Sequence, residues 1–476
     1  MLYFFLVILL SVIFALAVIF LVKKMPQKRD AILKSVVLVF SAVGFFRFML
    51  SDSFVFVING GYYGDVFYDA TDPLQTVLRW GYYLNYAILP MAVFFDSRFF
   101  RNIASYFCLP FSVLSALFFK DFMPYFLSPD GSGLHFSAGF RYFYFIIELA
   151  LAIALGVLIQ ICYKHVLNVK DGGEILRLAL GLPVIVLLMI PVYAPQSLFG
   201  YSQMIASQGS DYHTLWIVVL LLATLALYYG FRFRPYRERN MLCVFLTLVL
   251  FFHYDSLYLM GFSIPRLPIQ LCNIASYLYL IAIPFKCKRL FQFCFVANVT
   301  GAILAILLPD FTPGAFGFWN MHFVLEHSLV LMIPALAMGL RIFPRITRRS
   351  LKYTFVGFSL YFVFCLSAGI ILNGYSDVTG FEVNYFFLFD LDKAFDQFPF
   401  FSFTERIHLE FGRFEVYPLF VFTIYAAFLI LCVCFYHAVR LFYKMEDDHL
   451  ALRGSAIELY ERRTGKEARV PKEFAD

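Results

Sequence analysis

Apolar runs of about 20 residues recur along the whole chain and are separated by short polar connections. A helix of that length crosses a bilayer core of roughly 30 Å. The pattern predicts about thirteen membrane-spanning helices, near residues 2–22, 31–50, 76–95, 103–120, 141–163, 175–194, 214–232, 241–260, 268–286, 290–308, 323–342, 352–373 and 415–440. The first run has no basic residues before it and is followed by lysines, which favours an uncleaved anchor over a signal peptide.

The composition agrees with an all-α, polytopic membrane protein that lacks a large soluble domain. Of the 476 residues, 61% are hydrophobic and 15% are charged, and the mean hydropathy is +0.77. Soluble domains have about 25% charged residues. The nine cysteines lie mostly within apolar runs and include no CxxC pair, which predicts buried thiols, not a disulfide framework or a zinc site. The net charge of +6 comes from short loops, so no nucleic-acid partner is expected.

Basic connections alternate with connections that are poor in Lys and Arg. The basic ones are residues 23–29, 96–101, 163–170, 231–239, 286–289 and 341–352, and the others include 59–72 and 200–213. Lys- and Arg-rich loops stay in the cytoplasm. The alternation therefore predicts an N-terminus outside and a cytoplasmic, charged tail at 441–476, which we expect to be a short helix followed by disorder.

The first six spans resemble the next six, which suggests a parallel duplication. In both halves a basic loop with a proline, Pro26 or Pro235, precedes an apolar span of similar length. The alternative is that any two six-span stretches align this well. The interpretation divides the chain into an accessory half at 1–200, a seven-span half at 211–440 and the tail. Leu78 and Glu148 stand where the second half has Cys272 and His327, so any active centre belongs to the second half.

Polar residues of several spans in the second half fall at one depth near the outer leaflet. Cys272 lies about five residues into its span, roughly 7 Å below the outer interface. His327 lies about as deep in its own span, with Glu326 beside it. The other polar residues at this level are His213, Asp310, Asn384 and Tyr385. Ionisable groups are costly in a membrane, so they usually face a cavity or one another.

A thiol beside an imidazole suits acyl transfer. His327 can take the proton of Cys272 while the sulfur attacks an ester carbonyl, and Gln270 or Asn273 can donate to the oxyanion. The alternative for each residue is structural. A cysteine in a membrane helix is most often inert packing, and a histidine near a helix end, such as His322, is most often interfacial.

Residues 211 to about 440 resemble the YwaF-like family of bacterial integral membrane proteins. The resemblance rests on "DYHTLW" (211–216), "LPIQLCNI" (267–274), "GAILAILLPDF" (301–311), "FVLEHSLVLMIP" (323–334) and "NYFFLF" (384–389). That family is similar to a eukaryotic transmembrane acyltransferase that builds polyunsaturated ether phospholipids, and more distantly to androgen-induced membrane hydrolases. The resemblance implies a nucleophile at Cys272 and a partner histidine at His327.

The chain departs from the family pattern on both sides of the cysteine. Family members commonly have His and Asp there, whereas this sequence has Gln270 and Asn273. Amides keep hydrogen bonding but give no acid–base chemistry. The six N-terminal spans also lie outside the usual compact family member.

The favoured function is a lipid-modifying enzyme, either an acyltransferase or a lipid ester hydrolase. Cys272 and His327 are its predicted catalytic residues, and Gln270, Asn273, Asp310, His213, Glu326, Asn384 and Tyr385 are predicted to bind substrate or support the site. Membrane lipids are the expected substrate or ligand, with no metal and no other cofactor. The resemblance places the protein in a bacterial cytoplasmic membrane. The alternatives are a transporter, a lipid-binding scaffold, or a catalytically silent relative, the last favoured by Gln270 and Asn273.

Overall fold

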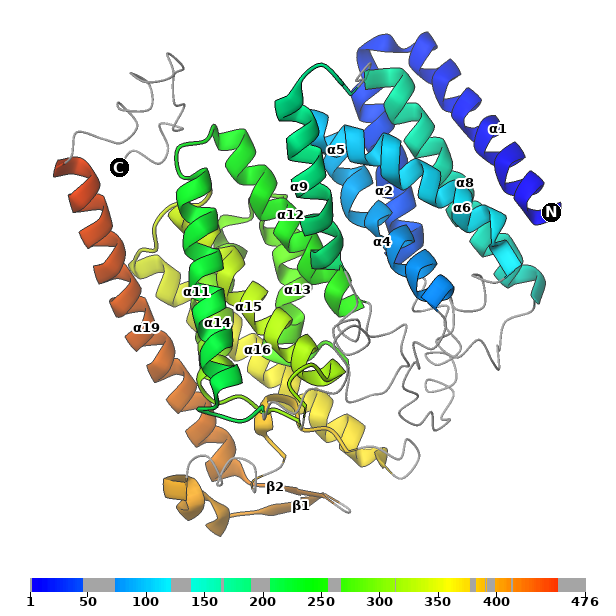
Figure 1. Cartoon of the computed structure of the whole chain (residues 1–476). Coiled ribbons are helices and arrows are strands. Elements are labelled where there is room, and N and C mark those ends of the chain that lie inside the picture. The colour runs from blue at the N-terminus through cyan, green and yellow to red at the C-terminus, as the bar shows by residue number, and fades with distance from the viewer. Residues whose placement is uncertain are drawn as a thin grey trace. The chain divides into compact units, whose positions relative to one another are not determined.

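The described part of the chain is helical apart from one small hairpin (Figure 1). The computed structural model describes residues 2–45, 73–120, 138–163, 167–189, 206–255, 267–312, 314–376, 382–389, 391, 399–411 and 414–452. The chain forms two compact units, one of Met1–Ser197 with Phe252–Ser263 and one of Leu198–Phe251 with Ile264–Asp476. The helical content confirms the predicted all-α architecture, and the long apolar helices agree with a multi-pass membrane protein.

The first unit is a bundle of helices with α8 and α4 at its centre. Its elements are α1 (Leu2–Lys24), η1 (Pro26–Lys28), α2 (Arg29–Phe45), α4 (Pro73–Phe94), α5 (Arg98–Ile103), η2 (Ala104–Cys108), α6 (Leu109–Leu117), α8 (Ala138–Tyr163) and α9 (Gly172–Met189). Helix α8 packs against α1, α2 and α6, and α4 packs against α2, α5 and α9. The central helices are apolar on most sides, as expected for helices buried within a membrane bundle.

Glu148 lies at the buried centre of the first unit. The Tyr86 hydroxyl donates to Glu148 Oε1 at 2.5 Å, and the Tyr82 hydroxyl donates to the Glu148 backbone carbonyl at 3.2 Å. The Tyr86 ring stacks on Phe40 with centroids 5.1 Å apart. A Cβ added to Gly44 would lie 2.0 Å from Tyr86 Cε1, so the absence of a side chain at Gly44 allows Tyr86 to reach the carboxyl group.

Gly44→Ala is expected to lower the stability of the protein by about 1–3 kcal/mol, because the new methyl group displaces a fully packed tyrosine. Thermal unfolding of the purified protein in detergent measures the change. Gly139→Ala is the matched control: Gly139 is also helical, but a Cβ there meets nothing within 4 Å. The control is expected to unfold at or slightly above the wild-type temperature. Equal unfolding temperatures for the two variants would contradict the close approach at Tyr86.

The second unit is a helix bundle built around α14. Its elements are α11 (Asp211–Phe231), α12 (Tyr236–Asp255, in this unit as far as Phe251), α13 (Leu271–Ala282), α14 (Lys288–Leu307), α15 (Phe318–Gly339), α16 (Arg348–Gly374), η5 (Tyr385–Phe387), η6 (Pro399–Arg406), β1 (Leu409–Phe411), β2 (Phe414–Val416) and α19 (Pro418–Leu452). Helix α14 packs against α13, α15, α16 and α19 and is largely buried. Helices α11, α16 and α19 expose most of their apolar residues, as helices that face lipid do.

Helix α13 is shorter than the predicted span at 268–286. It has only 12 residues, Leu271–Ala282. At its end the Cys287 N–H donates to the Ala282 carbonyl at 2.9 Å, and Lys286 adopts a left-handed φ of 55° that ends the helical path. Lys286 donates to Asn240 Oδ1, and burial lowers the pKa of Lys286 to about 8.

Among the described residues, seven helices are long and apolar enough to cross a membrane: α1, α8, α11, α14, α15, α16 and α19. A helix lies at each of the thirteen predicted spans, but several are too short or too polar by this criterion. The count of thirteen, the alternating topology and the duplication therefore stay predictions. The loop at 59–72 and the tail beyond residue 452 lie outside the described residues.

Candidate functional site

Cys272 is the second residue of α13 and is buried. The turn before it is tied to α16 and α14. The Tyr361 hydroxyl donates to the Ile269 carbonyl at 2.9 Å, and Asn298 Nδ2 donates to the Leu271 carbonyl at 2.6 Å. A Cβ at Gly301 would lie 3.8 Å from the Cys272 sulfur, so α14 passes close to the thiol. The packing of other helices thus fixes the position of Cys272.

His327 lies on α15 and is buried, with 8% of its surface exposed. Its Nδ1 is 2.7 Å from the Phe323 carbonyl oxygen, one helical turn earlier. A carbonyl oxygen only accepts, so Nδ1 carries the proton and, in the neutral ring, Nε2 is the basic nitrogen. The Phe323 ring lies against the imidazole with centroids 4.1 Å apart. This arrangement suits a general base that acts through Nε2.

Glu326 lies beside two histidines of α15. Its carboxylate is buried, and its Oε2 is 3.3 Å from His322 Nε2. His327 is the next residue along the helix. Sequence reasoning treated His322 as interfacial, whereas the structure buries it beside Glu326. The signal that could have identified it is the spacing of four residues, which places His322 and Glu326 on one face of a helix.

Within the described part of the chain, no hydrogen bond joins the Cys272 thiol to the His327 ring. Catalytic hydrogen bonds are often long or poorly aligned before substrate binds. Cys272 lies on α13, and His322, Glu326 and His327 lie on α15, which packs against α13.

The side chain of Gln270 forms hydrogen bonds with a turn that comes more than a hundred residues later in the chain. Its Nε2 donates to the Asn384 carbonyl at 2.9 Å, and its Oε1 accepts from the Phe386 N–H at 2.9 Å. The Asn384 side-chain oxygen accepts from the Phe389 N–H at 3.0 Å, and Tyr385 is buried in the same turn. The predicted supporting residues Gln270, Asn384 and Tyr385 therefore lie together, at the start of α13.

The remaining predicted residues take other places. His213 Nδ1 accepts from the Gly209 N–H at 2.9 Å, so its Nε2–H donates to the Ile306 carbonyl at 2.7 Å. Nδ1 thus holds the turn before α11, and Nε2 ties α11 to the end of α14. Asp310 is exposed beyond the end of α14. Asn273 is half-buried, and its backbone carbonyl accepts from the Ser276 hydroxyl at 2.7 Å.

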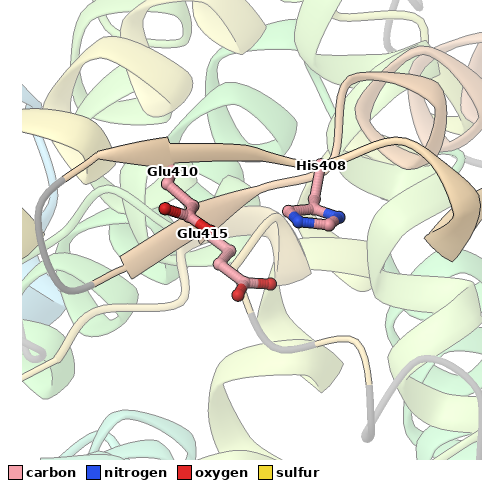
Figure 2. Close-up of side chains that lie close together, drawn as sticks. All are labelled: His408, Glu410 and Glu415. Atoms are coloured by element: carbon pink, nitrogen blue, oxygen red, sulfur yellow. The ribbon is translucent and has the colours of Figure 1, made fainter.

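One group of side chains could hold a metal ion, on the hairpin that precedes α19. His408, Glu410 and Glu415 lie on one face of strands β1 and β2, and their ligand atoms are within 4.8 Å of one another (Figure 2). Glu410 and Glu415 are directly opposite across the two strands. All three side chains are exposed. Their position on the hairpin gives them no part in the chemistry at Cys272.

Comparison with known proteins identifies the second unit. The family model described as the TMEM164 family matches residues 198–438, and unit two begins at Leu198. The chain belongs to the TMEM164 family. The match spans just over half of this TMEM164-family chain and covers the predicted seven-span half, Cys272 and His327 included. No curated protein and no solved structure matches the chain. The predicted relationships to YwaF-like proteins and, more distantly, to the hydrolases stay predictions.

Proposed function

We propose that this TMEM164-family protein is an integral-membrane enzyme that transfers acyl groups from lipid esters. Cys272 is the nucleophile and His327 is the general base. The observation that carries the proposal is the packing of α13 against α15, which brings the helix of the buried Cys272 alongside the helix of the buried Glu326 and His327. The resemblance to a transmembrane acyltransferase, carried by the motifs around Cys272 and His327, supports the same roles.

In the first step, the Cys272 sulfur forms a bond to the ester carbonyl carbon while His327 Nε2 takes the thiol proton. The bond from that carbon to the lipid oxygen breaks, and the departing lysolipid takes the proton from His327. In the second step, a hydroxyl group of water or of a second lipid gives its proton to His327 and attacks the thioester. The carbon–sulfur bond breaks and the sulfur regains the proton.

Burial affects the order of these events. Cys272, Glu326 and His327 are all buried, and a buried site disfavours a separated thiolate and imidazolium before the ester is attacked. Proton transfer therefore accompanies attack and does not precede it. The resulting mechanism needs no metal ion and no soluble cofactor, because the acyl donor and the acceptor can both be lipids.

One observation favours transport as a second function. Glu148 in the first unit is fully buried and hydrogen-bonded to Tyr86. Ionisable groups inside a membrane protein often mark a proton or ion pathway. A transporter with a lipid-binding second unit is the function that remains if no acyl group reaches Cys272.

Trapping of the acyl-enzyme tests the proposal. The full-length protein is mixed with a phospholipid that carries a labelled acyl chain, quenched in acid and digested. We expect a hydroxylamine-sensitive label on the peptide that contains Cys272 and no label on the peptides that contain the other buried cysteines, which are Cys108, Cys243, Cys294, Cys365 and Cys432. A Cys272 peptide that stays unlabelled at all quench times rejects the proposal. Free fatty acid as the final product indicates hydrolysis, and a newly acylated lipid indicates transfer.

A further inference from the structure

The turn at residues 384–388 is fastened to the start of α13, two residues before Cys272. Gln270 holds it through two hydrogen bonds, one to the Asn384 carbonyl and one from the Phe386 N–H, both 2.9 Å long. Asn384 closes the turn on itself by accepting from the Phe389 N–H. Gln270, the residue before α13, thus joins the turn to the start of that helix, while Asn373 of α16 bonds the N–H and the carbonyl of Val383 just before the turn.

The same turn contains two successive residues in the left-handed region. Phe386 has φ 56° and ψ 27°, and Phe387 has φ 57°. A Cβ makes this conformation costly, and residues retain it only where the surroundings hold them in place. The Phe387 side chain is 51% exposed, so its own packing offsets little of that cost. The hydrogen bonds of Gln270 and the packing of Phe386 are what hold the turn.

The Phe386 ring is inserted among aromatic rings of α16 and α19. Its centroid is 5.2 Å from Phe428, 5.4 Å from Phe358, 5.7 Å from Phe362 and 6.0 Å from Tyr361. Helices α16 and α19 leave most of their apolar surface exposed, which in a membrane faces lipid chains. The ring thus fills an apolar, aromatic-lined site on helices that border lipid.

This aromatic site also adjoins the turn that leads to Cys272. Tyr361 contacts the Phe386 ring, and its hydroxyl donates to the Ile269 carbonyl in that turn. A hydrocarbon chain that replaced the Phe386 ring would lie one side chain away from the turn before the residue that we assign as the nucleophile.

We propose that Phe386 occupies a binding site for the acyl chain of a membrane lipid, and that the turn at 384–388 withdraws the ring when a lipid enters. The occupant is an acyl chain because the site is lined with rings, carries no charged group among the contacts of Phe386, and lies on lipid-facing helices. The role of the bound lipid as acyl donor rests on the proposed function, whereas its binding does not.

Photo-crosslinking tests the site. The full-length protein is placed in bilayers with a phosphatidylcholine that carries a diazirine in its acyl chain, and the crosslinked peptides are identified by mass spectrometry. We expect crosslinks in the peptides that contain Phe358–Phe362 and Tyr425–Phe428. Gln270→Ala removes both hydrogen bonds to the turn and is expected to raise the yield in these peptides several-fold.

A matched pair at Phe387 isolates the backbone strain. Phe387→Gly and Phe387→Ala both remove the exposed ring, but only glycine adopts the left-handed φ without cost. Glycine therefore favours the inserted position of Phe386, and its crosslinking yield is expected to be about fivefold lower than that of the alanine variant. This pair keeps the test decisive even if Gln270→Ala fails to fold.

Two results would overturn the inference: no crosslinks in these peptides in the wild type and in the Phe387 variants, or equal yields for the glycine and alanine variants. The outcome is separate from that of acyl-enzyme trapping. Crosslinks here with no label on Cys272 support a lipid-binding site and reject the enzyme. A labelled Cys272 with no crosslinks here supports the enzyme and rejects the acyl-chain site.

Discussion

Cells that express the Cys272→Ala variant are expected to have the phospholipid acyl profile of cells that lack the protein. Alanine removes the sulfur that forms the thioester. The substitution removes one buried atom, so the helix bundle around α13 is expected to fold as in the wild type. Lipidomics of matched cultures, normalised to the amount of folded protein, measures the effect.

Cys294→Ala is the control for that experiment. Cys294 is equally buried, on the neighbouring helix α14, and its loss creates a cavity of the same kind. We expect this variant to keep the wild-type acyl profile. If Cys272→Ala keeps the wild-type profile as well, the enzyme interpretation is wrong.

Replacement of His327 by asparagine is expected to lower the rate of acyl transfer by about 100- to 10,000-fold, the usual contribution of a general base. The asparagine amide can reproduce the Nδ1–H and donate to the Phe323 carbonyl, so the local fold is preserved. It has no basic nitrogen at the position of Nε2. The rate of formation of the labelled acyl product by the purified protein in bilayers measures the loss.

His213→Asn serves as the contrasting variant. Both ring nitrogens of His213 are hydrogen-bonded, one to the Gly209 N–H before α11 and one to the Ile306 carbonyl of α14, so its loss is expected to lower the unfolding temperature. The rate for each folded molecule should stay close to that of the wild type. A wild-type rate in His327→Asn would show that the proton goes elsewhere, and Glu326 is then the residue to replace next.

The positions of the helices could be predicted because apolar runs of membrane length leave little alternative to a helix. The length of α13 could not be predicted in the same way. The run at 268–286 is apolar enough to continue the helix, but tertiary contacts to Ile269 and the left-handed turn at Lys286 limit it to Leu271–Ala282.

The candidate site was likewise predictable only in part. The rise per residue of a helix and the alternation of loops predict one depth for Cys272, Glu326 and His327. The role of Gln270 could not be foreseen, because its partners Asn384 and Phe386 come more than a hundred residues later in the chain. The role of His322 was missed for another reason. Its position at a predicted helix boundary suggested an interfacial residue, whereas it lies beside Glu326.

The shortness of α13 creates a local hydrophobic mismatch. Twelve residues span about 18 Å, against a hydrocarbon core of roughly 30 Å, so the predicted crossing at 268–286 requires non-helical backbone within the depth of the bilayer at one end or both. Such backbone is tolerated only where protein or a wet cavity satisfies its polar groups. Tyr361 and Asn298 donate to the carbonyls of Ile269 and Leu271, so protein groups satisfy the backbone that leads to Cys272.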